Sequence, residues 1–295
     1  MSILIQPDKH IALIMQPRSG SHVLRHFLSE ALGYDNALEL FNDLLSVYYV
    51  EINDNSTTYH NGGNIMPSDL TEQGLIMRSN DHLMMLNRLA TKKQFAVFGV
   101  CINSYWKHNN TLTNSISLHP NIQSIRLERA DVLYSILSVV MSKVTGIWHN
   151  TSRENNINAM SRKKIKPAVI DINYIEEELN EYLSVTDEIY KNFGELPIIY
   201  YEQFQNSLSS MKDLFDNIPR KLISIPFNKF VGNYKDLITN LDEVENLYEQ
   251  FVNEHKDYFP QYFGKLPHIK IPLSQGRQPR DLSLINDKLY NIEFA

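Results

Sequence analysis

The chain has 295 residues, of which 43% are hydrophobic and 21% charged, with a formal net charge of −6 and a pI of about 5.9. This amount of apolar material is enough for one large core, so we expect a single α/β domain over residues 1–295. The negative net charge excludes general attraction to nucleic acid or to an anionic membrane, so local groups must hold any anionic ligand.

Hydrophobic patterning predicts a parallel sheet, because short apolar runs alternate with stretches of helical periodicity. The predicted strands cover residues 10–15, 95–101, 122–127 and 197–201. The predicted helices cover residues 23–32, 70–89, 131–144, 172–193 and 241–251. Residues 53–67 and 150–167, rich in polar residues, are predicted to be exposed loops. Residues 252–295 are expected to form a C-terminal extension or lid.

The segment after the first predicted strand combines the groups that bind an oxyanion. Arg18, Ser19, Gly20 and Ser21 connect that strand to a helix. Backbone N–H groups at a helix start favour an anion, glycine allows its close approach, and Arg18 adds a forked cationic donor. The alternative is a serine-capped helix behind a glycine turn.

This segment resembles the phosphosulfate loop of the sulfotransferases that use 3′-phosphoadenosine-5′-phosphosulfate (PAPS). Residues 18–21 and Leu24 match the Arg-Ser-Gly-Ser-Thr-x-Leu pattern, and His22 stands in place of its threonine. The resemblance implies that Arg18, Ser19, Gly20, Ser21 and His22 bind the sulfated end of PAPS. A nucleoside triphosphatase loop fits poorly, because the Gly-x-x-x-x-Gly-Lys-Ser/Thr pattern is missing.

A second motif follows the predicted strand at residues 122–127. Arg129 closes the strand, Asp131 is a suitable N-cap, and Ser138 lies about two turns further on the same helix face. Arg129 and Ser138 are also compatible with a surface ion pair and a serine bonded to its helix backbone. The run from Arg129 to Trp148 resembles the bacterial trehalose-sulfotransferase type, which implies that Arg129 and Ser138 bind the 3′-phosphate of PAPS.

Sulfuryl transfer to a hydroxyl requires a base for the hydroxyl proton. The resemblance places the base at Glu39, although an acid there also suits the start of an amphipathic helix. His22 is the alternative base, and Arg18 is expected to stabilise the transferring group. Histidines elsewhere (His26, His82 and His149) remain open, and Lys107 is the nearest lysine to the strand or loop where many relatives carry one.

The resemblance implies a P-loop-like three-layer fold with helical insertions, PAPS as co-substrate, no metal, and a small hydroxyl acceptor such as a sugar. The alternatives are a non-catalytic nucleotide- or anion-binding module and, less well matched, a nucleotide kinase. Polar segments at residues 228–237 and 275–282 are both candidates to close the nucleotide site.

The expected location is the cytoplasm. The lone cysteine, Cys101, cannot form an internal disulfide, and the N-terminus lacks a signal-peptide pattern. No apolar run reaches the roughly 20 residues of a membrane helix, so no membrane span is expected. The sequence leaves open whether the chain is a monomer or a homo-oligomer.

Overall fold

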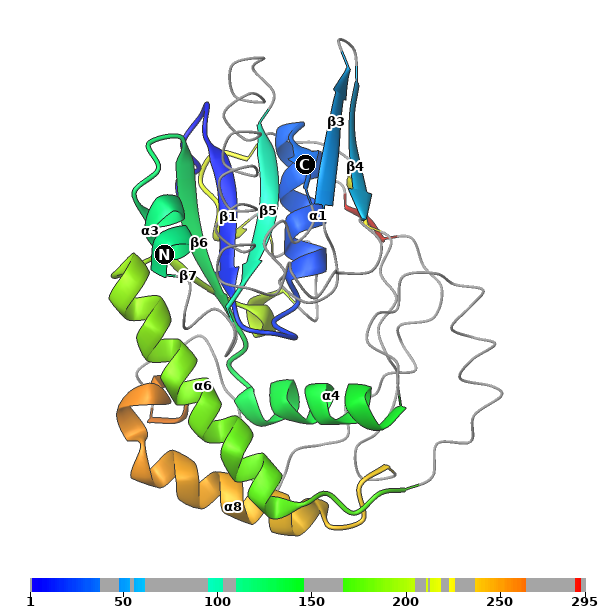
Figure 1. Ribbon diagram of the computed structural model, residues 1–295, viewed down its shortest axis with the longest axis vertical. Coiled ribbons are helices and arrows are strands. Elements are labelled where there is room, and N and C mark those ends of the chain that lie inside the picture. The colour runs from blue at the N-terminus through cyan, green and yellow to red at the C-terminus, as the bar shows by residue number, and fades with distance from the viewer. Residues whose placement is uncertain are drawn as a thin grey trace. The chain divides into compact units, whose positions relative to one another are not determined.

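The computed structural model describes residues 2–37, 48–53, 56–61, 95–102, 110–145, 167–204, 211, 213–218, 223–225, 237–263 and 290–292. Its strands, in chain order, are β1 (His10–Met15), β2 (Asp35–Asn36), β3 (Tyr48–Asn53), β4 (Ser56–Asn61), β5 (Ala96–Cys101), β6 (Ile122–Glu128), β7 (Ile198–Tyr200), β8 (Ile223–Ile225) and β9 (Tyr290–Ile292). Its α-helices are α1 (Ser21–Leu32), α3 (Asn110–Ser117), α4 (Val132–Thr145), α6 (Ile172–Phe193) and α8 (Leu241–Glu254) (Figure 1). The described residues also form the short 3-10 helices η3 (Tyr201–Gln203), η5 (Lys256–Tyr258) and η6 (Pro260–Phe263).

The largest sheet has five strands in the order β2-β5-β1-β6-β7. Each neighbouring pair in this sheet is parallel. The inner strands β1 and β5 are apolar along almost their whole length and buried at every residue, as expected for a parallel sheet covered on both faces. The predicted α/β architecture with a parallel sheet is therefore confirmed.

Helices cover both faces of this sheet. Successive strand residues point to opposite faces, so alternate residues of β1 and β5 belong to different layers. One face packs against α3 and the C-terminal half of α6; its core cluster includes Ala12, Ile14, Phe98, Val100, Ile116, Val185 and Ile189. The helix α1 contacts β1, β2 and β5, and in Figure 1 it runs beside β5. The buried residues of α1, Val23, Leu24, Phe27 and Leu28, cover the other face, onto which Ile11 and Leu13 point.

The chain separates into two compact units. The first comprises Met1–Glu128, Ser184–Ile223 and Asn291–Ala295 and contains the five-stranded sheet. The second comprises Arg129–Leu183 and Ser224–Tyr290. One boundary passes between Glu128 and Arg129, and another passes within α6. The single domain over residues 1–295, with residues 252–295 as an extension or lid, stays a prediction.

The second unit has a core of its own, built from α4, the N-terminal half of α6, and α8. Tyr248 of α8 is fully buried there, and its hydroxyl lies 2.8 Å from that of Tyr262. The ring of Phe259 packs edge-on against Tyr248 and stacks on Tyr182 of α6. The side chain of Asn240 holds the segment before α6, because it accepts the N–H of Ile170 at 2.9 Å and donates to its carbonyl at 2.8 Å.

One secondary-structure prediction was wrong. The segment 53–67 was predicted to be an exposed loop, but residues 56–61 form β4, which pairs antiparallel with β3. Asp54 and Asn55 alone separate the two strands, and such residues are common between hairpin strands. Thr57, Thr58 and Tyr59 favour a strand, whereas the prediction gave more weight to the polar composition. The predictions for residues 70–89 and for most of 150–167 lie outside the described residues.

Candidate anion site

The carboxyl end of β1 is the point at which the strand order of the sheet reverses. From β1 the chain passes through α1 to β2 on one side of the sheet, whereas β6 is followed by β7 on the other side. In open α/β sheets, ligands bind outside the carboxyl ends of the strands at such a switch point. The segment from Gln16 to Gly20 leaves β1 at this position, so the topology and the sequence motif indicate the same part of the molecule.

The backbone of this loop is constrained at two residues. Arg18 has a φ of 64°, a left-handed conformation that non-glycine residues seldom adopt and that clusters at ligand sites. Gly20 has a φ of 88°. An added Cβ atom at Gly20 would lie 2.2 Å from Cδ2 of Tyr201, a buried residue of η3. Gly20 is therefore required both by its φ and by the ring that packs against it.

The loop leads directly into the first turn of α1, which begins at Ser21. Gly20 provides no side-chain cap, and the first turn contains no acidic residue. The positive end of the helix dipole is consequently not neutralised by a side chain of its own first turn.

Ser19 adds a donor to this loop. It is only 2% exposed, and its Oγ has no hydrogen-bond partner among the described residues. A buried hydroxyl without a partner costs about 1–3 kcal/mol, and an oxyanion bound at this loop would supply the missing acceptor.

His22 is tied to a buried cation within α1. Nη2 of Arg25 lies 3.0 Å from Nδ1 of His22, and Nε of Arg25 donates to Oδ1 of Asn36 at 2.7 Å. Arg25 is 1% exposed, whereas His22 is exposed. Asn36 ends β2, so Arg25 links the first turn of α1 to the carboxyl end of that strand.

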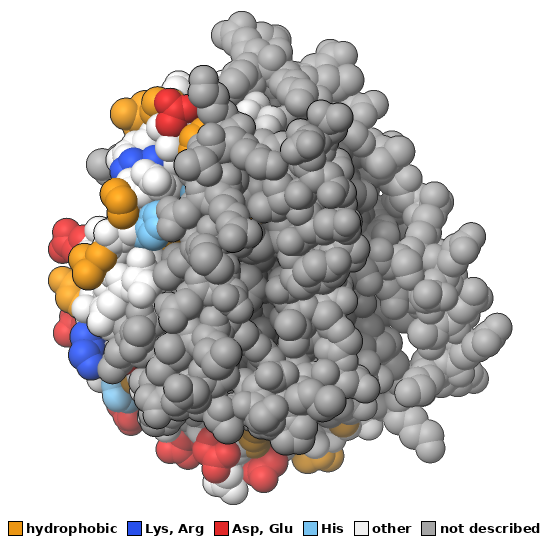
Figure 2. All heavy atoms as spheres, turned by 45° about the horizontal axis from the view of Figure 1, so that its top comes forward, with side chains coloured by type: hydrophobic (Ala, Val, Ile, Leu, Met, Phe, Trp, Pro, Cys, Tyr) orange, Lys and Arg blue, Asp and Glu red, His pale blue; other side chains and the backbone are white. Residues whose placement is uncertain are grey.

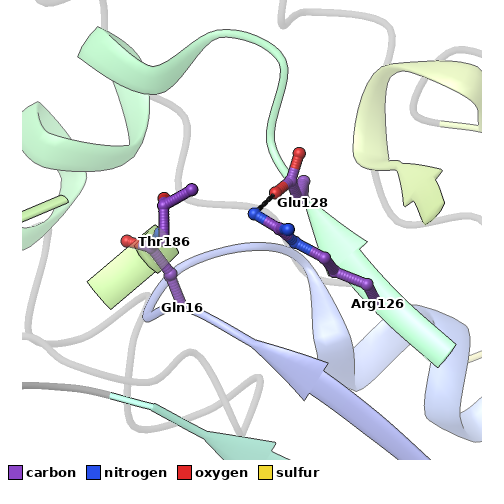
Figure 3. Close-up of polar contacts among 4 residues, drawn as sticks. All are labelled: Gln16, Arg126, Glu128 and Thr186. Carbon is purple, nitrogen blue, oxygen red and sulfur yellow. Dashed lines mark hydrogen bonds and ion pairs between the residues drawn. The ribbon is translucent and has the colours of Figure 1, made fainter. Parts of the chain in front are cut away.

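A polar cluster lies at the carboxyl ends of β6 and β7. Arg126 and Glu128 point to the same face of β6 and form an ion pair (Figure 3). Tyr200, which pairs with Glu128 in the strand register, donates its hydroxyl proton to that carboxylate. Burial raises the pKa of Glu128, while Arg126 and the Tyr200 hydrogen bond oppose that rise. Burial and the neighbouring Glu128 charge raise the pKa of Tyr200.

This cluster lies beside the start of the loop. Ile14 pairs with Arg126, so continuing the register by two residues brings Gln16 next to Glu128. Gln16 donates through Nε2 to Oγ1 of Thr186 at 3.0 Å, which connects the loop to α6 (Figure 3). Titratable groups with shifted pKa values, such as Glu128 and Tyr200, are common in functional sites, and ligands bind at switch points of this kind.

Sequence patterns predicted no role for Arg25, Arg126, Glu128, Tyr200 or Tyr201. The sequence does contain a signal for Arg126 and Glu128. They are two residues apart at the end of a predicted buried strand, so both charges lie on the same face of that strand. The contact of Tyr201 with Gly20 joins residues 181 positions apart, and no local pattern predicts it.

The other predicted phosphate-binding residues lie in the second unit. Arg129 follows β6 directly, and Ser138 is a partly buried residue of α4. Asp131 caps α4 as predicted: it is buried, and its Oδ1 accepts the N–H of Tyr134 at 3.4 Å. The carbonyl of Ala130 accepts a hydrogen bond from Nε2 of Gln261 at 2.9 Å, which fixes the connection between Arg129 and α4.

Several predicted site residues lie outside the described residues. They are Glu39, Lys107, His82, His149 and the segments 228–236 and 275–282. His26 is described and is a partly buried residue of α1. Of the predicted residues 18–22, Arg18, Ser19 and Gly20 lie in the loop after β1, and Ser21 and His22 begin α1.

Two further properties concern the described residues alone. Their His, Cys, Asp and Glu side chains form no group of three that could hold a metal ion. None of their helices has both the length and the apolarity needed to cross a membrane.

The described surface carries acidic side chains. Figure 2 shows Asp and Glu side chains along the lower edge of the face it presents. Exposed Asp242 and Glu243 begin α8. The net charge of −6 gives an anion little general attraction, so an anion at the loop with Arg18 would depend on local groups.

No protein-family model matches the chain, and neither a curated protein nor a solved structure matches it. The similarity to PAPS-dependent sulfotransferases therefore depends on the motifs at residues 18–24 and 129–148.

Proposed function

We propose that the protein is a PAPS-dependent sulfotransferase that transfers a sulfuryl group to a hydroxyl of a small acceptor, with a carbohydrate as the favoured class. The observation that carries the proposal is the loop at the carboxyl end of β1. It combines the left-handed Arg18, the buried hydroxyl of Ser19, and Gly20 held against Tyr201. These groups precede the uncapped first turn of α1, and together they suit a tetrahedral oxyanion.

In this proposal the fold is P-loop-like, and the loop binds the 5′-phosphosulfate. Arg18 has planar donors for the transferring group and the leaving phosphate, and Ser19, Ser21 and the backbone of Gly20 supply shorter-range donors. The resemblance assigns the 3′-phosphate to Arg129 and Ser138.

The transfer itself makes one bond and breaks one. The acceptor oxygen bonds to sulfur as the bond from sulfur to the 5′-phosphate oxygen breaks, which releases 3′-phosphoadenosine 5′-phosphate. The hydroxyl proton passes to a base, for which the resemblance favours Glu39. Donors fixed around the leaving phosphate lower the barrier by stabilising the charge that develops there.

The alternative function is a nucleotide- or anion-binding module that performs no transfer. The substitution of His22 for the threonine of the sulfotransferase pattern favours it, since one hydroxyl contact is lost. Such a module would bind the nucleotide, yet it would not consume PAPS with any acceptor, and Glu39→Gln would leave its function intact.

Calorimetric titration with 3′-phosphoadenosine 5′-phosphate, and separately with ATP and magnesium, tests the donor site. We expect magnesium-independent binding of the first ligand, weakened at least about tenfold by Arg18→Ala and by Arg129→Ala, because each removes a charge-assisted hydrogen bond. Lys191→Ala is the matched control, since it removes one positive charge from the exposed end of α6.

The Arg18 and Arg129 variants test the two predicted phosphate contacts separately. A preference for ATP with magnesium would contradict the proposal and favour a kinase. Equal losses in Lys191→Ala would mean that the loop and Arg129 act only through net charge.

A further inference from the structure

The ring of His22 is held in one protonation pattern by Arg25. The guanidinium of Arg25 carries only donors, so its Nη2 can bond to Nδ1 of His22 at 3.0 Å only if Nδ1 accepts. Arg25 is itself fixed, since it is buried in α1 and donates through Nε to Asn36. A neutral His22 in this geometry therefore carries its proton on Nε2.

This tautomer is unsuited to a general base. A base must present an unprotonated atom to the acceptor hydroxyl, but Nδ1 is already occupied by a donor and Nε2 holds a proton. It is suited to an anion, because Nε2–H is a donor. His22 is exposed, is the second residue of α1, and follows directly on the loop at residues 18–21.

We infer that His22 donates a hydrogen bond from Nε2 to an oxygen of the anion bound at residues 18–21, and that Arg25 is the positioning residue that fixes this donor. The inference rests on the proposed anion site. His22 was predicted both as a ligand-binding residue and as the alternative base; the inference assigns it to ligand binding alone and leaves the proton to Glu39.

The tautomer can be measured without any ligand. In long-range ¹H–¹⁵N correlation spectra at neutral pH, we expect Nδ1 of His22 to have the shift of an unprotonated nitrogen and Nε2 that of a protonated one. Arg25→Met should mix the two tautomers, with circular dichroism as the check on folding. A wild-type ring protonated on Nδ1 would overturn the inference, whatever the Arg25 variant does.

Two amide substitutions separate the donor from the base. The side-chain amide of Gln reaches the position of Nε2, whereas that of Asn matches Nδ1. We expect His22→Gln to keep the affinity for 3′-phosphoadenosine 5′-phosphate within about threefold, and His22→Asn and His22→Ala to lose about tenfold or more. Equal losses in His22→Gln and His22→Ala would overturn the inference, because a donor at that position would then be without effect.

Inorganic sulfate is the second probe and separates this inference from the proposed function. If the wild type binds sulfate but not the nucleotide, the sulfotransferase proposal fails. The donor role would still be supported if the affinity for sulfate is kept in His22→Gln and lost in His22→Asn and His22→Ala. If the nucleotide binds and all three His22 variants bind it as the wild type does, the donor role fails alone.

Discussion

At the scale of single residues, Gly20 and Tyr201 determine the shape of the anion loop. The ring of Tyr201 occupies the space that a Cβ atom of residue 20 would need. A substitution at Gly20 therefore has two separate costs, one from the positive φ and one from the displaced ring. Gly33 shares the first cost alone, since its φ is 70° and no atom lies within 4 Å of an added Cβ.

We expect Gly20→Ala to lower the free energy of unfolding by more than Gly33→Ala, for which the φ penalty alone is about 1–2 kcal/mol. Urea denaturation of the two variants measures the difference. The double variant Gly20→Ala/Tyr201→Ala should recover part of the loss if the ring is its cause. Equal effects of Gly20→Ala and Gly33→Ala would mean that the loop moves away from Tyr201 at little cost.

A second prediction at this scale concerns the pH dependence of stability, because burial raises the pKa of Glu128. At pH values between 4.5, the ordinary pKa of a glutamate, and the raised pKa of Glu128, the folded chain keeps a proton that the unfolded chain has lost. The free energy of unfolding contributed by this group therefore falls as pH rises through that window and is level above it.

Urea midpoints of the wild type and Glu128→Gln over a pH series measure this contribution as a difference. We expect the wild type to lose stability relative to Glu128→Gln as pH rises from about 4.5. The opposite slope would mean that the charge of Arg126 outweighs burial.

At the scale of elements, α6 links the loop to the sheet. Its Thr186 bonds to Gln16, and one helical face carries Val185 and Ile189 into the core cluster. The helix has the bounds that hydrophobic periodicity predicted, residues 172–193. Local periodicity predicts such a helix well because the spacing of its apolar residues is set by the helix itself.

Val185→Ala should lower the free energy of unfolding by about 1.5–3 kcal/mol, because it removes apolar contacts and leaves a cavity in the sheet core. The matched control is Val169→Ala at a residue that is 77% exposed, where we expect a change within about 0.5 kcal/mol. Denaturant midpoints compare the two. Similar losses at both positions would contradict the packing of α6 on the sheet.

The helix α4 offers a prediction about its cap. Asp131→Ala should destabilise the protein by about 0.5–2 kcal/mol, because it removes the acceptor for the N–H of Tyr134. Asp131→Asn keeps an acceptor there and should cost less. If urea midpoints fall equally in both variants, the carboxylate charge rather than the cap is what matters.

At the scale of the whole molecule, the parallel sheet and most of the helices that the structure describes were predictable from sequence. Buried parallel strands are continuous apolar runs, and β1 agrees with its predicted range of residues 10–15. The strand order was not predictable, because pairing partners such as Ile11 of β1 and Val97 of β5 are 86 residues apart in the chain. The hairpin of β3 and β4 was missed because residues 56–61 are mostly polar, a composition that also suits a loop.

The candidate site divides in the same way. The loop from Arg18 to Ser21 was predictable, since its residue types and its place after a strand are local features. Three other features depend on the strand order, which sequence does not predict. They are the packing of the Tyr201 ring against Gly20, the cluster of Glu128 with Tyr200, and the switch point beside β1. These distant contacts turn a short motif into a candidate anion site.

The most direct test of that site is a titration with 3′-phosphoadenosine 5′-phosphate followed by backbone amide NMR. We expect the largest shifts at the N–H groups of Ser19, Gly20 and Ser21, and we expect Arg18→Ala to abolish them at the same ligand concentration. Binding that leaves these amides unchanged, or no binding at all, would contradict the assignment of this loop as the site of the phosphosulfate.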